Sequence, residues 1–259
     1  MSIDRPIFKK SFTADSVPSW ICPTCNRGVL ESEQKNFKIF ESSESKSNHT
    51  HNAWEPNWDY GAFIGFLQCN SSKCSEIVGI IGKMQVEEGQ VFDEENDYSS
   101  FVYYKELTPT KFHPALHIFN INKDVPKEIT NAILNAFDIF WTDLSACGNK
   151  IRSVVECILD DRRVPKTYID KGNRKGYTLH KRIEIFKKSN PEEADNFMAI
   201  KWIGNTGSHQ INNLTKDDIM DGLEILEYVT NNLYDKNNPR IKKLSKKINK
   251  RKRPLGKKV

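Results

Sequence analysis

Four of the six cysteines stand in two closely spaced pairs. Two residues separate Cys22 from Cys25, and four separate Cys69 from Cys74. A tight turn between paired cysteines presents both thiolates to one ion, so two such pairs can supply all four ligands of a tetrahedral site. Zn2+ suits this donor set because it is a filled-shell ion without redox chemistry, and a closed four-thiolate site is structural. The spacing therefore predicts a structural zinc site.

Two other interpretations of the cysteine pairs stay open. The thiols can be reduced and free of metal, or one pair can be redox-active, although no βαβ pattern surrounds Cys22. His49 and His51 lie between the pairs and could serve as alternative ligands. They belong to residues 42–52, a stretch rich in Ser, Lys and Asn that indicates a surface loop, so we leave them unassigned.

Runs of β-branched and aromatic residues accompany the cysteine pairs and are separated by clusters of Gly, Asn, Asp and Ser, a pattern typical of strands joined by turns. The predicted strands cover residues 37–40, 63–68, 77–86 and 101–107. We expect residues 1–113 to form a small β-rich domain that the zinc clips together. Its aromatic residues either pack in the core or stack on bases, and core packing is the commoner role. They are Trp20, Trp54, Trp58, Tyr60, Phe63 and Phe66.

After residue 113 the apolar residues recur with the period of an α-helix. A helical segment is predicted over residues 126–161, with Gly148-Asn149 as the place where it kinks or divides. Cys147 and Cys157 fall on the apolar part of this segment. We expect them to be buried rather than nucleophilic.

Three further helices are predicted, and the last two of them start at capping signals. They begin near residue 178, at Pro191 and at Thr215, and the last continues through Leu233. Residues 165–177 are predicted to form a loop. Four or five helices joined by short loops make a bundle. The predicted fold class is therefore α+β, with an all-α bundle over residues 114–235 following the β-rich domain.

Positive charge is concentrated at the C-terminal end. The formal net charge is +5, and residues 236–259 hold twelve Lys and Arg and no acid, so the preceding 235 residues carry a net charge of −7. A basic run of this density is typical of nucleic-acid contact. A solvated, disordered tail or an amphipathic helix on a partner are the alternatives. The residues nominated for nucleic-acid binding are Lys242, Lys243, Lys246, Lys247, Lys250, Arg251, Lys252 and Arg253.

One helical segment conflicts with its own helix propensity. Residues 201–209 contain Gly204, Asn205, Gly207 and His209, all of which are poor helix formers. Such a conflict marks a candidate functional site. The competing interpretation is a helix C-terminus that uses Gly204 or Gly207 as its cap.

Two motifs in the second half resemble a known family. Arg152-Ser-Val-Val-Glu156 resembles the R-x-x-x-E segment of the family called domain of unknown function 4145, and residues 201–209 resemble its R-x-x-G-N-x-x-x-H signature. The similarity covers about residues 115–235. It implies a helical bundle similar to HEPN domains, many of which are dimeric, metal-independent ribonucleases. It also implies a role in prokaryotic restriction or antiphage defence.

The resemblance nominates a catalytic set. Its members are Arg152, Glu156, Asn205 and His209, with Lys201 where the family prefers Arg. In RNA cleavage, His209 would transfer protons, and Arg152 or Lys201 would stabilise charge on the phosphate. The sequence departs from the active HEPN motif R-[polar]-x-x-x-H, because Gly204 stands where that motif has Arg. Arg152 and Glu156 also fit an ordinary ion pair on a helix surface.

These features favour a binding module over an enzyme. We expect a zinc-containing protein that binds nucleic acid or a partner such as a defence-system protein, and that forms a homodimer. The alternative is a HEPN-like, metal-independent ribonuclease with His209 as acid and base.

Several other classes of protein are excluded by the sequence. With 37% apolar residues, the chain is not wholly disordered. No run of about 20 apolar residues predicts a membrane span, and the charges in residues 1–10 do not fit a signal peptide, so we expect a cytoplasmic protein. No P-loop, dinucleotide fingerprint, metalloprotease motif or nucleophile elbow is present.

Overall fold

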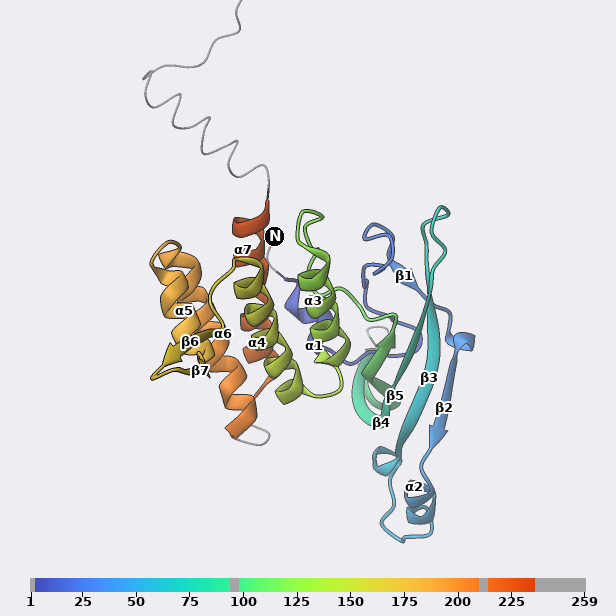
Figure 1. Ribbon diagram of the computed structural model, residues 1–259. Coiled ribbons are helices and arrows are strands. Elements are labelled where there is room, and N and C mark those ends of the chain that lie inside the picture. Colours follow the sequence, from blue (N-terminus) through green and yellow to red (C-terminus); the bar gives the residue numbers. More distant parts are fainter. Residues whose placement is uncertain (1–2, 94–97, 210–213, 236–259) are drawn as a thin grey trace, which may run out of the picture. The chain divides into compact units, whose positions relative to one another are not determined.

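The computed structural model describes residues 3–93, 98–209 and 214–235 (Figure 1). The fold is mixed α and β, as predicted, with an antiparallel sheet in the first half and mainly helices in the second. The chain divides into two compact units. Unit 1 comprises Met1–Ile118 and Leu134–Cys147, and unit 2 comprises Phe119–Ile133 and Gly148–Val259.

Five strands form the sheet of unit 1 (Figure 1). Strand β3 (Tyr60–Cys69) pairs antiparallel with β4 (Ile77–Asp93), and β4 pairs with β5 (Tyr98–His113). Strands β1 (Leu30–Glu31) and β2 (Phe37–Glu41) follow one another along the other edge of β3. The four predicted strands are confirmed. Strands β3 to β5 are longer than predicted because antiparallel pairing continues through the polar residues and glycines at their ends.

One face of the sheet, here called the inner face, covers an aromatic core. Trp20 is fully buried, and its Nε1 donates a hydrogen bond to the carbonyl oxygen of Ile7 at 2.8 Å. The Trp20 ring packs edge to face on Phe12 and on Phe112, an arrangement that aromatic quadrupoles favour. Phe63 of β3 is also buried. The core role is therefore confirmed for Trp20 and Phe63.

Short helical turns precede and connect the strands of unit 1. They are α1 (Arg5–Lys9), η1 (Gln34–Asn36), α2 (Ser43–Asn48) and η2 (Pro56–Trp58). Helix α2 lies within the stretch predicted as a loop. It forms because the side chain of Ser42 accepts a hydrogen bond from the backbone nitrogen of Ser45 at 3.1 Å, which satisfies a free donor of the first turn.

The helical segment predicted over residues 126–161 is divided, but Gly148-Asn149 is not the dividing point. Helix α3 (Lys127–Phe140) and helix α4 (Leu144–Asp161) are separated by residues 141–143. The carboxylate of Asp143 accepts from the backbone nitrogen of Ala146 at 2.9 Å, and this N-cap interaction starts α4. Gly148-Asn149 lies inside α4.

A β-hairpin occupies most of the loop predicted at residues 165–177. Strand β6 (Thr167–Asp170) pairs with β7 (Asn173–Gly176). The two turn residues between them, Lys171 and Gly172, have φ values of 48° and 79°, which is the pattern of a two-residue type I′ turn. The prediction that the second half is all-α is therefore wrong in this segment. Its strands are mostly polar and exposed, so they lack the apolar alternation that would predict them.

The three remaining helices begin close to their predicted positions. They are α5 (Leu179–Lys187), α6 (Pro191–His209) and α7 (Lys216–Tyr234). Thr215 and Asp218 form a reciprocal capping box at the start of α7. Helix α6 runs beyond Trp202, so Gly204 lies in its interior and is not a C-terminal cap. Among the described residues, no helix is long and apolar enough to cross a membrane.

Gly204 lies where helices α4 and α6 pack closely together. A Cβ atom at this position would come within 2.9 Å of both the Arg152 Cβ and the Gly148 carbonyl oxygen. The carbonyl oxygen belongs to the backbone of α4 and cannot move aside without distorting that helix. The close contact explains why a residue with poor helix propensity occupies a helix interior.

We expect Gly204→Ala to lower the free energy of unfolding by about 1–2 kcal/mol. Overpacking costs about 1–3 kcal/mol, which exceeds the roughly 1 kcal/mol that alanine gains over glycine in a helix. Chemical denaturation measures the difference. The control is Gly176→Ala, because a Cβ there meets only the Lys166 carbonyl oxygen, at 4.0 Å. A Gly204→Ala variant as stable as the wild type would contradict the close packing.

Candidate metal centre and sheet surface

The first cysteine pair lies in a tight turn closed by backbone hydrogen bonds. The nitrogen of Asn26 donates to the carbonyl oxygen of Cys22 at 2.9 Å, and the nitrogen of Cys22 donates to the carbonyl oxygen of Gly28 at 2.8 Å. Asn26 has a φ of 52°, a left-handed conformation that Asn tolerates better than most residues. The turn brings the Cys22 and Cys25 side chains to the same side of the chain.

The second cysteine pair lies in the turn between β3 and β4. Cys69 is the last residue of β3, and its nitrogen donates to the carbonyl oxygen of Glu76 at 2.9 Å. The nitrogen of Cys74 donates to the carbonyl oxygen of Ser71 at 2.9 Å, which closes the turn. The strand pairing therefore fixes the position of this pair.

Asn70 joins the two turns directly. Its backbone nitrogen donates to the Val29 carbonyl oxygen at 3.0 Å, and its side-chain oxygen accepts from the Val29 nitrogen at 3.0 Å. A second link runs from the Thr24 hydroxyl to the Glu76 carboxylate at 2.8 Å. Together these bonds hold the two cysteine pairs opposite each other.

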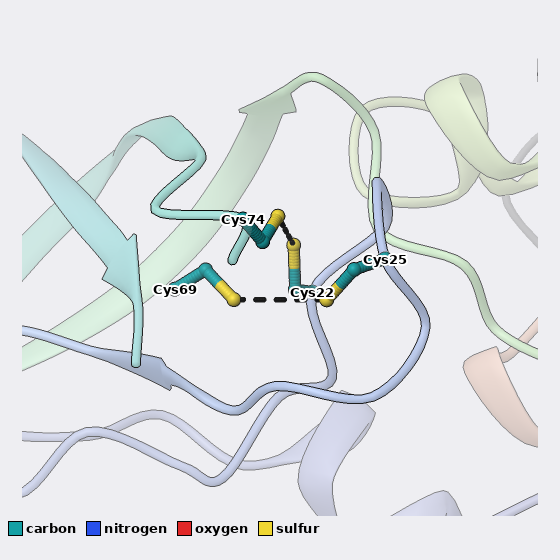
Figure 2. Close-up of side chains that lie close together, drawn as sticks. All are labelled: Cys22, Cys25, Cys69 and Cys74. Carbon is teal, nitrogen blue, oxygen red and sulfur yellow. Dashed lines mark hydrogen bonds between the residues drawn. The ribbon is translucent and has the colours of Figure 1, made fainter. Parts of the chain in front are cut away.

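The four sulfur atoms converge on one point (Figure 2). Cys22 Sγ lies 3.8 Å from Cys74 Sγ, and Cys25 Sγ lies 3.7 Å from Cys69 Sγ. All four sulfurs are within 4.8 Å of one another, and none forms a disulfide. Zn–S bonds of about 2.3 Å in a tetrahedron separate the sulfurs by about 3.8 Å. The arrangement fits a tetrahedral metal ion held by four thiolates, with no open position for a substrate.

Gly28 leaves the space that one of these sulfurs occupies. A Cβ atom at this position would lie 2.3 Å from the Cys69 Sγ. Its backbone nitrogen also donates to the Cys25 Sγ at 3.3 Å. A residue with a side chain at position 28 would displace the second cysteine pair from the first.

Two of the thiols have pKa values shifted in opposite directions. Hydrogen bonds from the backbone amides of Gly28 and Arg27 lower the pKa of Cys25 to about 6. Burial raises the pKa of Cys69 to about 12. Near neutral pH the Cys69 thiol therefore keeps its proton unless a cation replaces it, so ion binding at this cluster releases protons.

The two histidines between the cysteine pairs have other partners. His49 contacts the carboxylates of Glu41 and Asp59, each at 2.9 Å, and the His51 ring lies against Trp58 with centroids 5.5 Å apart. Neither histidine joins the sulfur cluster. The interpretation that they serve as alternative ligands of the cysteine site finds no support in this geometry.

The residues nominated for catalysis lie on α4 and α6. Arg152 forms an ion pair with Glu156 at 3.6 Å, and its aliphatic part packs against Gly204. The Lys201 amine lies 3.6 Å from the centroid of the Trp202 ring. Asn205 is half-buried. The structure thus brings the Arg152 and Gly204 motifs together.

Other predicted site residues lie outside the part of the chain that the structure describes in full. His209 ends α6, but its side chain is among those not described, so its predicted role as acid and base stays a prediction. The eight basic residues of the tail also lie outside the described residues.

The second face of the sheet, here called the outer face, carries exposed apolar residues that sequence reasoning mostly missed. Ile64 pairs with Ile81 in register, and Phe66 pairs with Gly79. Its large apolar side chains, those of Phe40, Ile64, Phe66, Ile77 and Ile81, are 43–57% exposed. In residues 62–67 apolar residues or glycine occupy every position, so alternation does not distinguish the faces. The name outer face is used here for nine side chains on β2, β3 and β4 between residues 38 and 83, namely Lys38, Phe40, Ala62, Ile64, Phe66, Gln68, Ile77, Ile81 and Lys83.

Two family models match separate parts of the chain. Residues 134–251 match a family model described as domain of unknown function (DUF4145). Residues 10–112 match another, described as domain of unknown function (DUF8608). The first match contains Arg152 and residues 201–209, and it confirms the resemblance predicted from those motifs. The second contains all four cysteines of the cluster. No curated protein and no solved structure matches the chain.

We expect Cys69→Ser to weaken binding of Zn2+ or Co2+ to the cysteine cluster by more than about tenfold, because a neutral hydroxyl replaces one of four thiolates. Competition with a chromophoric chelator measures this affinity. Cys157→Ser is the control, because Cys157 is half-buried on α4 and is not part of the cluster. If both variants bind the ion as tightly as the wild type, the four sulfurs do not form the site.

Proposed function

We propose that the chain is a zinc-containing module that binds single-stranded nucleic acid on the outer face of its sheet. The observation that carries this proposal is the composition of that face. It combines exposed aromatic and aliphatic side chains with lysines, and it holds no carboxylate among its nine residues. Bases stack on apolar surfaces, and lysines neutralise phosphates.

The sheet register supports one continuous surface. Lys38 lies opposite Ile64, which lies opposite Ile81. Two residues further along each strand, Phe40 lies opposite Ala62, which lies opposite Lys83. Lysines therefore stand at both sides of an apolar strip whose side chains all point the same way, because alternate residues of a strand share a face.

Acidic groups border this surface. Glu106 of β5 stands in register with Gln85, two residues beyond Lys83 on β4. Glu31 of β1 stands in register with Gln68, and its carboxylate accepts a hydrogen bond from the side chain of Asn70 at 2.8 Å. Asp138 forms an ion pair with Lys111 of β5 at 2.7 Å. The nine residues of the outer face carry the positive charges of Lys38 and Lys83, which favour a negatively charged ligand.

The cysteine cluster holds one end of this surface in place, because Cys69 is the last residue of β3. Zn2+ is the ion that we propose for it, because the sulfur spacing and the closed four-thiolate set suit zinc. The basic tail, residues 236–259, would add phosphate contacts that are independent of sequence. From the family resemblance we further propose a homodimer that acts with a partner in restriction or antiphage defence.

The ribonuclease alternative has a narrower basis. Arg152 packs beside Gly204, which places one cation near the family signature. Proton transfer by His209 stays a prediction from sequence, so the binding module is the function that the described residues support better.

We expect Phe66→Ala to raise the Kd for a fluorescent single-stranded oligonucleotide about tenfold. Loss of one base-stacking side chain costs about 1–3 kcal/mol. Fluorescence anisotropy on the full chain measures the Kd. Phe101→Ala is the matched control, because Phe101 is 63% exposed but pairs with Gln90, on the opposite side of the β4–β5 ribbon. Wild-type affinity in the folded Phe66→Ala variant would refute binding at the outer face.

A further inference from the structure

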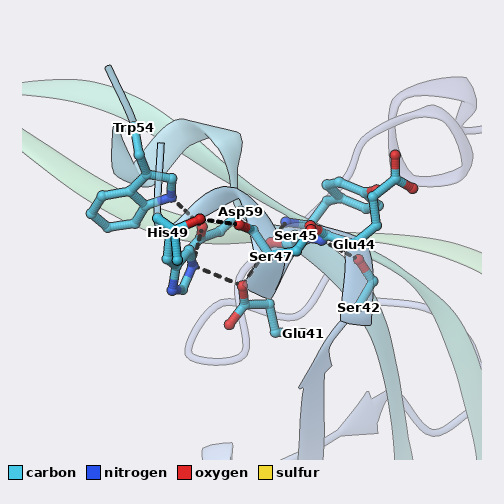
Figure 3. A network of polar contacts seen from close by, with 10 residues as sticks. Glu41, Ser42, Glu44, Ser45, Ser47, His49, Trp54 and Asp59 are labelled. Atoms are coloured by element: carbon cyan, nitrogen blue, oxygen red, sulfur yellow. Dashed lines mark hydrogen bonds and ion pairs between the residues drawn. The ribbon is translucent and has the colours of Figure 1, made fainter. Parts of the chain in front are cut away.

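A second group of metal-ligating side chains gathers where β2 ends and β3 begins (Figure 3). Glu41 is the last residue of β2, His49 follows helix α2, and Asp59 directly precedes β3. Strand pairing of Glu41 with Gly61 places the two carboxylates near each other. Helix α2 then brings the chain back towards the start of β3, so that the His49 imidazole reaches both carboxylates.

The contacts within this group exceed what one imidazole nitrogen can satisfy. His49 Nε2 lies 2.9 Å from Glu41 Oε1 and 2.9 Å from Asp59 Oδ1. A ring nitrogen carries at most one hydrogen, so it can form a linear hydrogen bond with only one of the two oxygens. A metal ion can be coordinated by the nitrogen and both oxygens at the same time. Metal–ligand bonds of about 2.1 Å at right angles separate neighbouring ligand atoms by about 3.0 Å.

The net negative charge of the group also favours the binding of a cation. The Glu41 and Asp59 side chains are only 22% and 21% exposed. Within the described residues, His49 is their only ion-pair partner, so the group carries at least one net negative charge even when the imidazole is protonated. Poorly solvated carboxylates without full compensation are costly, and a divalent ion offsets that cost.

Neighbouring hydrogen bonds hold the two carboxylates in place without neutralising them. The Ser45 hydroxyl donates to Glu41 Oε1 at 2.7 Å, and Trp54 Nε1 donates to Asp59 Oδ1 at 3.2 Å. Ser45 is fully buried and also accepts from the backbone nitrogen of Tyr60 at 3.2 Å. Neutral donors of this kind orient the carboxylates of metal sites.

We propose that Glu41, His49 and Asp59 bind a divalent transition-metal ion, with Zn2+ as the favoured ion. One imidazole nitrogen and two carboxylate oxygens suit such an ion better than Ca2+ or Mg2+, which take mainly oxygen ligands. The site has three protein ligands, and His49 is 39% exposed, so water completes the coordination. It differs from the cysteine cluster in having no sulfur and in being open to solvent.

Titration of the metal-free full chain with Co2+ tests the proposal, because thiolate ligands give intense charge-transfer absorption that nitrogen and oxygen ligands do not. We expect the wild type to bind two Co2+ ions, one at each ligand group. His49→Ala should bind one ion and keep the full thiolate absorption. His51→Ala, in the same loop but stacked on Trp58, should still bind two.

Retained thiolate absorption shows that a variant is folded around its cysteines, so loss of the second ion then reports on the proposed ligands. Asp59→Asn provides a milder change, since an amide oxygen still accepts from Trp54, and it should weaken the second ion about tenfold or more. Binding of a single Co2+ ion by the wild type, or of two by His49→Ala, would overturn the proposal. His49 would then form ion pairs with Glu41 and Asp59 without a metal ion.

Discussion

The convergence of four cysteine sulfurs is the interaction on which unit 1 depends. Thiolates at separations of 3.7 and 3.8 Å repel one another strongly, and burial keeps the Cys69 thiol protonated with a pKa of about 12. A divalent ion removes both obstacles, because it offsets the negative charge and replaces the proton. A bound ion would join residues 22–25 to the turn between β3 and β4, which are distant in sequence.

This link also bears on which face of the sheet is covered and which is exposed. Trp20, two residues before the first cysteine, is held against Phe12 and Phe112 on the inner face. The inner face is thereby filled by the N-terminal segment. The outer face has no such covering segment among the described residues of unit 1, and its apolar side chains remain available to a ligand. The proposed metal site and the proposed nucleic-acid surface therefore depend on the same arrangement.

The sequence was most informative where a local rule applies. Cysteine spacing predicted the cluster of four sulfurs, and the Thr215 capping box predicted the start of α7, because each depends on only a few neighbouring residues. The interpretation of Gly204 as a helix C-terminal cap was wrong, because α6 continues to His209. The structural role of Gly204 depends on Arg152 and Gly148 of another helix, and such a contact leaves no local pattern.

The two faces of the sheet illustrate the same limit. Phe63 is buried and Phe66 is exposed, yet both lie in an apolar stretch without alternation. Only the pairing of β3 with β2 and β4 assigns each residue to a face. The Glu41, His49 and Asp59 group was missed for a similar reason, since its members are brought together by strand pairing and by the return of α2.

Hydrogen–deuterium exchange with and without a chelator tests the central role of the cysteine cluster most directly. We predict that chelation removes protection from the backbone amides of Cys22 and Asn70, which bond to Gly28 and Val29, while the amides of α7 in unit 2 stay protected. Unchanged protection at Cys22 and Asn70 after complete metal removal would contradict it.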